Sequence, residues 1–299
     1  MIVSPSSKSF PGTRGRRVKE FGFRVAALSS LVLVVGPAFW LILGVVVHAV
    51  PHWRWNVLTT LSQGTSGGLE NAVVGTLVLM VGVLLIAGTI GILAGVHLAE
   101  LARPRLRGGS GGALVRTAID VLSGFPSIVL GYVGYVALCV GLHWGFSLLP
   151  ALLILSLMVV PYITKSTESA LRQVPTNYRE AADALGMATG YALRKVVIRA
   201  ALPGIVTGVL MALAIAGGET APLLYTAGAT NNLPTWTLLH HPISYLTYYV
   251  WTDYNQPVPS AQHLSYDAAL ILIVLVLTLL VVARLTVART QRHAEGGRY

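Results

Sequence analysis

The chain has 299 residues, of which 54% are hydrophobic and only 11% are charged, and its mean hydropathy is +0.69. Soluble domains carry about 25% charged residues, so the composition excludes a typical water-soluble enzyme, and the high hydrophobicity excludes intrinsic disorder. The single cysteine, Cys139, excludes an internal disulfide and a cysteine-rich metal site. The net charge of +10 indicates contact with the cytoplasmic face of a membrane rather than with nucleic acid.

Apolar stretches long enough to cross a bilayer, which takes roughly 20 helical residues, recur along the chain. We therefore predict an all-α fold, a polytopic membrane bundle of six transmembrane helices. The run from 121 to 164 has no charged residue and is too long for one helix, so it suits two, with a break near Gly141–Pro150. The expected spans are 25–47, 72–96, the two halves of 121–164, 200–218 with a continuation through Glu219 to about Tyr225, and 264–283.

The basic residues predict the orientation of these spans. If the N-terminus is cytoplasmic, all of the 21 lysines and arginines except Arg54 fall in inside segments. Because positive charge is retained on the cytoplasmic side, we expect a multi-pass protein of the cytoplasmic membrane with both termini inside. The first apolar stretch is longer than the core of a signal peptide, so it is interpreted as an uncleaved anchor that follows a basic arm at 1–20.

The longest outside connection, 226–263, is rich in tyrosine and tryptophan. These side chains prefer the headgroup region, so the segment is either an aromatic belt on a short interfacial helix or a docking surface for an outside partner. The pair His240–His241 has no cysteine or carboxylate at ligand spacing, which disfavours a metal site. The aromatic residues are Trp236, Tyr245, Tyr248, Tyr249, Trp251 and Tyr254.

The inside segment 100–116 contains a glycine-rich stretch, ELARPRLRGGSGG. A phosphate-binding loop requires Gly-Lys followed by Ser or Thr, and no Gly-Lys pair occurs in this chain. We therefore interpret the segment as a flexible basic connection, and any energy from ATP must come from another polypeptide.

The long inside loop, 165–203, contains a helix signature. Asn177 and Glu180 have the spacing of a capping box, which predicts a short helix over 178–185, and Gly186 is suited to end it. A second short helix is expected over 189–199.

One face of the first helix is apolar. Ala181, Ala184 and Leu185 share this face at i, i+3, i+4 spacing. The face suits the groove of a partner protein, or else it packs under the bundle.

The same residues carry a resemblance to a known family. Glu180-Ala181-Ala182, three residues and then Gly186 resemble the EAA signature of the permeases of binding-protein-dependent ABC importers. The resemblance implies the type I ABC importer permease fold, with the loop acting as a coupling helix that docks on an ATP-hydrolysing subunit. The coupling residues it implies are Glu180, Ala181, Ala182, Leu185 and Gly186.

Two further segments look like the phosphate permeases of this family. They are DVLSGFPSIVLGYVGY at 120–135 and GETAPLLYT at 218–226. The likeness runs over 68–288 and implies a permease subunit that forms half of the pore of an ATP-driven importer of inorganic phosphate. The alternative is an importer of another oxyanion, molybdate or sulfate. The implied domains are the basic arm 1–20, the first transmembrane helix and outer loop 21–67, the permease domain 68–288 and a cytoplasmic tail 289–299.

The implied partners are a second homologous permease subunit, a dimeric ATP-binding subunit, an extracytoplasmic phosphate-binding protein and membrane lipid. Nucleic acid is not expected. The subunit itself has no catalytic residue, cofactor or metal, although it is part of an ATP-hydrolysing complex.

Charged and helix-breaking residues in or near the spans are the candidates for translocation and gating, because charges in a bilayer are costly unless they are paired or hydrated. Asp120 is expected to form an ion pair with Arg116. Glu219 suits a gate or a packing role, since a carboxylate repels phosphate. The full set is Asp120, Pro126, Ser127, Glu219, Thr220 and Pro222.

Two other classes of protein are less compatible with the sequence. An integral-membrane enzyme needs catalytic groups clustered at one depth, but the eight histidines are scattered. A self-sufficient channel does not require an elaborate inside loop, and uptake that persisted without ATP would favour it.

Overall fold

The computed structural model describes residues 13–101, 110–235 and 237–295. All secondary-structure elements in this part of the chain are helices, in agreement with the predicted all-α fold. The chain divides into two compact units, Met1–Pro51 and His52–Tyr299. By length and composition, five described helices can cross a membrane, and one bent pair raises the number to six.

The first unit contains one long helix, α1 (Thr13–Ala49), which includes Pro37. The predicted anchor at 25–47 lies within it. Membrane helices tolerate an internal proline. Residues 13–20 of the expected basic arm are helical, and residues 1–12 lie outside the described part of the chain.

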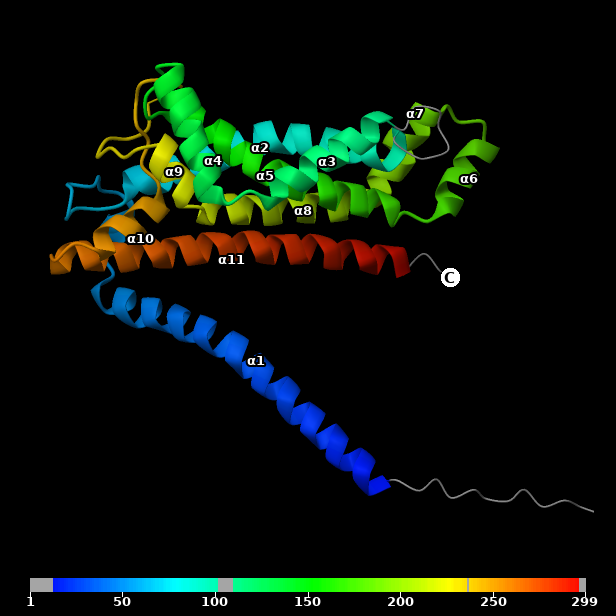
Figure 1. Ribbon diagram of the computed structural model, residues 1–299, viewed down its shortest axis with the longest axis horizontal. Coiled ribbons are helices and arrows are strands. Elements are labelled where there is room, and N and C mark those ends of the chain that lie inside the picture. Colours follow the sequence, from blue (N-terminus) through cyan, green and yellow to red (C-terminus); the bar gives the residue numbers. More distant parts are fainter. Residues whose placement is uncertain (1–12, 102–109, 236, 296–299) are drawn as a thin grey trace, which may run out of the picture. The chain divides into compact units, whose positions relative to one another are not determined.

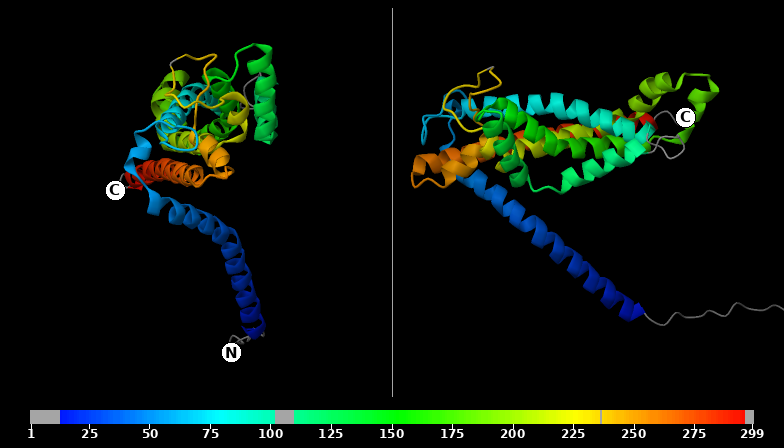
Figure 2. Two further views of the ribbon diagram at one scale, coloured as in Figure 1. Left: turned by 90° about the vertical axis from the view of Figure 1, so that its left-hand side faces the viewer. Right: turned by 45° about the horizontal axis from the view of Figure 1, so that its top comes forward.

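Four long helices of the second unit run along a common direction (Figures 1 and 2). They are α2 (Glu70–Val96), α5 (Leu148–Arg172), α8 (Ile198–Gly218) and α11 (Pro259–Glu295). The core between α2, α5 and α8 contains Leu79, Val83, Leu155, Val159, Ile163 and Ala212.

Small residues let α2 approach α5 closely. A Cβ atom on Gly91 would lie 2.7 Å from the Cβ of Ile163, and one on Gly95 would lie 2.5 Å from the Cβ of Thr167. Close approach through small residues is the usual basis of helix packing in membranes. The glycines of α2 therefore determine how tightly the bundle core closes.

The third predicted span is not straight. It consists of α3 (Ser110–Gly124), α4 (Ser127–Gly134) and a π-helical segment (Tyr135–Gly141), with a bend of 100° between α3 and the rest. Proline has no backbone N–H and disfavours helical geometry in the residue before it, so Pro126 breaks the helix. The predicted break near Gly141–Pro150 is present, because α5 begins at Leu148.

The fifth predicted span also differs from expectation. We predicted a continuous helix to about Tyr225, but α8 ends at Gly218 and Glu219 is extended, with φ −74° and ψ 132°. A separate short helix, α9 (Ala221–Thr226), follows, with Pro222 in its first turn. Proline is favoured there because the first N–H groups of a helix have no partner within the helix.

The loop at 165–203 contains α6 (Thr176–Ala184). The predicted capping box is wrong: the N-cap is Pro175, with no side-chain cap, so Asn177 already lies inside the helix. Proline fixes the extended conformation that an N-cap needs, and the helix starts earlier than predicted. Gly186 ends the helix as predicted, with φ +67°, because glycine adopts this left-handed conformation without strain.

The second predicted loop helix does not end near Arg199. Instead, α7 (Thr189–Ala192) continues through a π-helical segment (Leu193–Val197) into α8. The whole run, Thr189–Gly218, passes as one span of 30 residues. A continuous helix therefore leads from the loop at 165–203 into the bundle.

The opposite end of this unit carries the short helix α10 (Leu246–Tyr254) within the long connection. Only part of its aromatic set suits an interfacial belt. Trp251 and Tyr254 are exposed, whereas Tyr245 and Tyr249 are buried, and Trp236 lies outside the described residues. The hydroxyl group of the buried Tyr249 is satisfied by a hydrogen bond, because the Asn71 amide donates to it at 2.9 Å.

Candidate functional site

Two helix breaks meet in the second unit. The break before α4 places Ser127 next to the break after α8, so that the Ser127 side chain lies within reach of the carboxylate of Glu219. The Thr247 hydroxyl of α10 donates to the backbone carbonyl of Glu219 at 2.8 Å. Glu219 is therefore held by two elements that lie far from it in the sequence.

Next to this contact, α4 and α9 pack closely against each other. A Cβ atom on Gly131 would lie 2.5 Å from the Cα of Pro222, so only glycine fits there without a shift of the backbone. The rings of Tyr132 and Tyr225 meet edge to face at 6.0 Å. Irregular backbone at membrane depth is a recurring feature of transporter binding sites and gates, and this junction is the candidate gate.

The structure brings together most of the predicted gating residues. Ser127 lies next to Glu219, and Gly131 of α4 contacts Pro222 of α9. Pro126 and Thr220 are the N-cap residues of these two helices. Asp120 is separate from this group, because it lies in α3 and pairs with Lys165 of α5 at 2.9 Å.

The predicted pair of Asp120 with Arg116 is wrong. Arg116 instead pairs with Glu168 of α5 at 2.7 Å. Both residues of the predicted pair face α5, and carboxylates and cations of the neighbouring helix offer partners there. These two ion pairs fasten α3 to α5.

Two cavities lie near the α10 end of the second unit. The smaller, about 10 Å³, is enclosed among core residues that include Thr76 and Tyr245. The larger, about 310 Å³, is lined by polar residues that include Thr230, Asn231 and Asp253. Burial raises the pKa of Asp253 to about 6, so at neutral pH this carboxyl group is mostly ionised and repels an anion.

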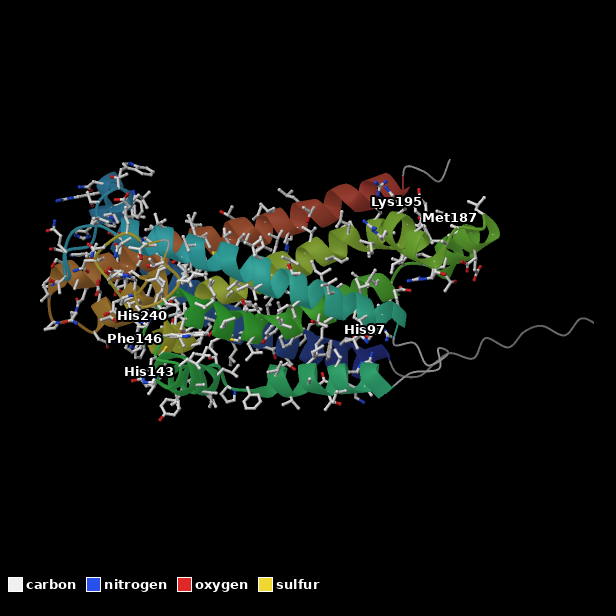
Figure 3. The ribbon with its side chains drawn as sticks, turned by 90° about the horizontal axis from the view of Figure 1, so that it is seen from above. His97, His143, Phe146, Met187, Lys195 and His240 are labelled. Carbon is white, nitrogen blue, oxygen red and sulfur yellow. The ribbon has the colours of Figure 1, made fainter. Side chains whose placement is uncertain are left out.

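The loop that contains α6 projects from one end of the second unit (Figure 1). Figure 3 shows the labelled Met187 and Lys195 at this end and His143, Phe146 and His240 at the other. Leu185 is 79% exposed and Ala182 is buried. Ala181 and Ala184 are exposed as well, so the apolar face does not pack under the bundle, which removes one of the two interpretations of this loop.

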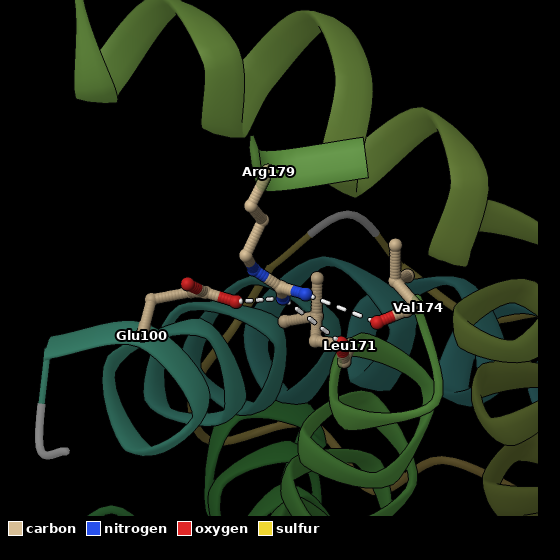
Figure 4. A network of polar contacts seen from close by, with 4 residues as sticks. All are labelled: Glu100, Leu171, Val174 and Arg179. Atoms are coloured by element: carbon tan, nitrogen blue, oxygen red, sulfur yellow. Dashed lines mark hydrogen bonds and ion pairs between the residues drawn. The ribbon is translucent and has the colours of Figure 1, made fainter. Parts of the chain in front are cut away.

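The base of the loop is fastened by Arg179 (Figure 4). One guanidinium nitrogen lies 2.6 Å from the Glu100 carboxylate and 3.2 Å from the Leu171 carbonyl, and another lies 3.0 Å from the Val174 carbonyl. From the sequence, no role is predicted for Arg179 or for Glu100. No local pattern could have paired them, since they are 79 residues apart.

Comparisons with known proteins identify the family. Residues 87–290 match the model of the binding-protein-dependent transport system inner membrane component. The chain is 55% identical over 270 residues to "phosphate transport system permease protein PstA 2" of Mycobacterium bovis, covering 90% of this chain and 88% of the relative. It is 32% identical to "phosphate transport system permease protein PstA" of Haemophilus influenzae, covering 86% and 90%.

The fold agrees with this family. An inward-facing structure of the MetNI methionine ABC transporter superposes with a TM-score of 0.54 at 20% identity, covering 74% of this chain and 94% of that one. The predicted type I ABC importer permease fold is therefore confirmed. The chain belongs to the family of binding-protein-dependent transport system inner membrane components, and it is a multi-pass membrane permease of an ABC transporter.

Proposed function

We propose that this chain is a permease subunit of an ATP-driven importer of inorganic phosphate and forms half of its pore. The observation that carries the proposal is the position of the two segments that resemble phosphate permeases, 120–135 and 218–226. These segments supply the two sides of the junction at Ser127–Glu219 and Gly131–Pro222. The names of the relatives at 55% and 32% identity support the same substrate.

The other half of the pore is a second, homologous permease subunit. The arm of α3 and α4 supports this arrangement, because it exposes large apolar side chains around the helix break that a partner helix or lipid must cover. A polar path can then run between the two subunits. The exposed residues include Leu114, Val121, Phe125, Ile128, Val129, Tyr132 and Val133.

ATP hydrolysis takes place on a separate, dimeric ATP-binding subunit, since this chain contains no Gly-Lys pair for a phosphate-binding loop. That subunit docks on the coupling residues Glu180, Ala181, Ala182, Leu185 and Gly186. An extracytoplasmic binding protein delivers phosphate at the opposite end. Closure of the ATP-binding subunits moves the loop, and the two permease halves rock to alternate access, as in other transporters.

The same proposal includes the topology and the domains. Both termini are cytoplasmic, because this orientation leaves only Arg54 of the basic residues outside. The arm 1–20, the first span with its outer loop at 21–67, the permease domain at 68–288 and the tail at 289–299 follow from it.

A labelling experiment tests the topology. In a Cys139→Ser background, Gly190→Cys is expected to react with an impermeant maleimide only from the cytoplasmic side, because Gly190 is exposed and its Cβ meets no atom within 4 Å. Asn232→Cys, at an exposed position of the opposite end, is the matched control and should react only from outside. Labelling of Gly190→Cys in intact cells would contradict the orientation.

The substrate is tested with the whole complex. Proteoliposomes that contain both permeases and the ATP-binding subunit, with binding protein added outside, are expected to accumulate radiolabelled phosphate only when ATP is enclosed with the cytoplasmic face. Excess molybdate or sulfate should not compete. Uptake of either anion in preference to phosphate would favour the alternative oxyanion importer.

The Glu219→Gln variant tests the gate. A charge-assisted hydrogen bond is about twice as strong as a neutral one, so the variant weakens the contact with Ser127, and transport is expected to change about fivefold, for about 1 kcal/mol. Binding-protein docking should be unaffected. Ser127→Ala removes the same bond but keeps the charge, and it should have a similar effect. Wild-type rates in both variants would reduce Glu219 to a packing residue.

A further inference from the structure

The contact between Arg179 and Glu100 joins three elements. Arg179 belongs to α6 of the coupling loop and Glu100 to the π-helical segment His97–Leu101 that follows α2. Of the two accepting carbonyls, that of Leu171 lies at the end of α5 and that of Val174 in the short link between α5 and α6. Figure 4 shows the guanidinium reaching from α6 into the angle between them. A planar group with several fixed donors is suited to such a joint, because one side chain can bind a carboxylate and carbonyls at the same time.

This contact is shielded from water. The side chains of Arg179 and Glu100 are only 17% and 15% exposed. They lie at the cytoplasmic apolar cluster to which α2, α5 and α8 all contribute, with Ala99, Leu171, Val174, Val197, Ala201 and Ile205 as its buried members. Breaking a shielded ion pair by removing one partner is much more costly than breaking a surface pair. The joint therefore resists separation when the loop is pushed or pulled.

The π-helical turn explains why Glu100 faces the loop. A π turn holds one residue more than an α turn, which rotates the side chains that follow by up to about 100°. In a regular α-helix the Glu100 carboxylate would therefore point in a different direction. Such turns are frequent at functional sites, and this one aims a carboxylate at Arg179.

Further ion pairs extend the connection to the candidate gate. Glu168 and Lys165 of α5 bind Arg116 and Asp120 of α3. The α3 helix leads directly into the break at Pro126 and to Ser127, which contacts Glu219. A displacement of α6 can thus reach the gate through charged contacts between α6, α5 and α3.

We propose that Arg179 and Glu100 form a mechanical clamp, a pair of positioning residues that makes α2 and α5 move with the coupling loop. The proposal rests on the proposed function, because it assigns how ATP hydrolysis on the docked subunit is converted into movement of the spans. The clamp touches neither phosphate nor ATP. Without it the loop swings on its own and ATP is hydrolysed without transport.

The decisive measurement is the amount of phosphate transported per ATP hydrolysed by the whole complex in proteoliposomes. Arg179→Gln and Glu100→Gln are each expected to lower this ratio about tenfold, within the range typical of coupling between two sites. The double variant should be no worse than either single one, because all three lack the same contact. Arg179→Lys keeps the charge but not the planar guanidinium with its several donors, so its ratio should lie between those of Arg179→Gln and the wild type.

The matched control is Arg172→Gln. Arg172 also binds a glutamate, Glu168, at 2.8 Å, but within the same helix and with its side chain 54% exposed. Its loss removes an arginine and an ion pair without separating two elements, so the ratio should stay within about twofold of wild type.

Two results would overturn the clamp. One is an unchanged phosphate-to-ATP ratio in Arg179→Gln, and the other is loss of the ATP-binding subunit from the purified variant, which would assign Arg179 to docking. Failure of the proposed function looks different: the wild-type complex would itself prefer another anion. The ratio would then be measured with that anion, so the clamp is tested in either case.

Discussion

Gly186→Arg is expected to abolish ATP-driven uptake while leaving the chain folded in the membrane. Gly186 has φ +67°, and a Cβ atom there would meet nothing within 4 Å, so the arginine side chain finds space and the backbone strain costs only about 1–2 kcal/mol. The new charge stands beside Leu185, which is 79% exposed. It would have to be desolvated against the docking groove, so the ATP-binding subunit should no longer bind.

The Gly186→Ala variant separates the effect of backbone strain from that of a side chain that blocks docking. Alanine suffers the same left-handed backbone conformation but adds neither bulk nor charge, so most of the uptake should remain. The measurements are phosphate uptake, the amount of permease in the membrane and the amount of ATP-binding subunit that copurifies. Normal uptake by Gly186→Arg would remove the coupling assignment of this turn.

Gly131→Ala is expected to cost most of the transport activity. The added Cβ would lie 2.5 Å from the Cα of Pro222, a backbone atom that cannot move without shifting α9. Overpacking of this kind costs typically about 1–3 kcal/mol. The shift should separate α4 from α9 and pull Ser127 away from Glu219, so uptake should fall about tenfold or more.

Gly124→Ala is the control on the same arm, because a Cβ atom there meets nothing within 4 Å. It should retain transport and thermal stability. Equal uptake and equal melting temperature in Gly131→Ala and wild type would mean that α4 and α9 yield to each other without consequence, and the junction would then have no claim to be a gate.

The membrane spans of this chain can be predicted from the sequence, whereas the geometry of the breaks within them cannot. Uninterrupted apolar runs determine the spans, because lipid admits few other solutions. The end of α6 at Gly186 is also predictable, since a single residue type suits the left-handed conformation. Pro126 marks the place of the bend between α3 and α4, but the size of the bend and the break at Glu219 depend on how two distant segments pack, and hydropathy carries no signal for that.

The candidate site shows the same division. Family-like motifs pointed to Ser127 and Glu219, but not to their mutual contact. Asp120 lies four residues after Arg116, which favoured a local pair, yet α5 offers both residues closer partners. The role of Glu100 could not be predicted, because its ion pair depends on a π-helical turn and on an arginine 79 residues away.

The helical run from Thr189 to Gly218 is a second connection between the coupling loop and the bundle. Its 30 residues form a rod about 45 Å long at the usual rise, with the docking turn at one end and Glu219 at the other. The helix continues through the π-helical segment and past Pro203, so a displacement at its start is passed along its axis. If Gly186 couples to the ATP-binding subunit as proposed, its displacement reaches the Glu219 end of α8 along this helix, while α2 and α5 are moved through Arg179.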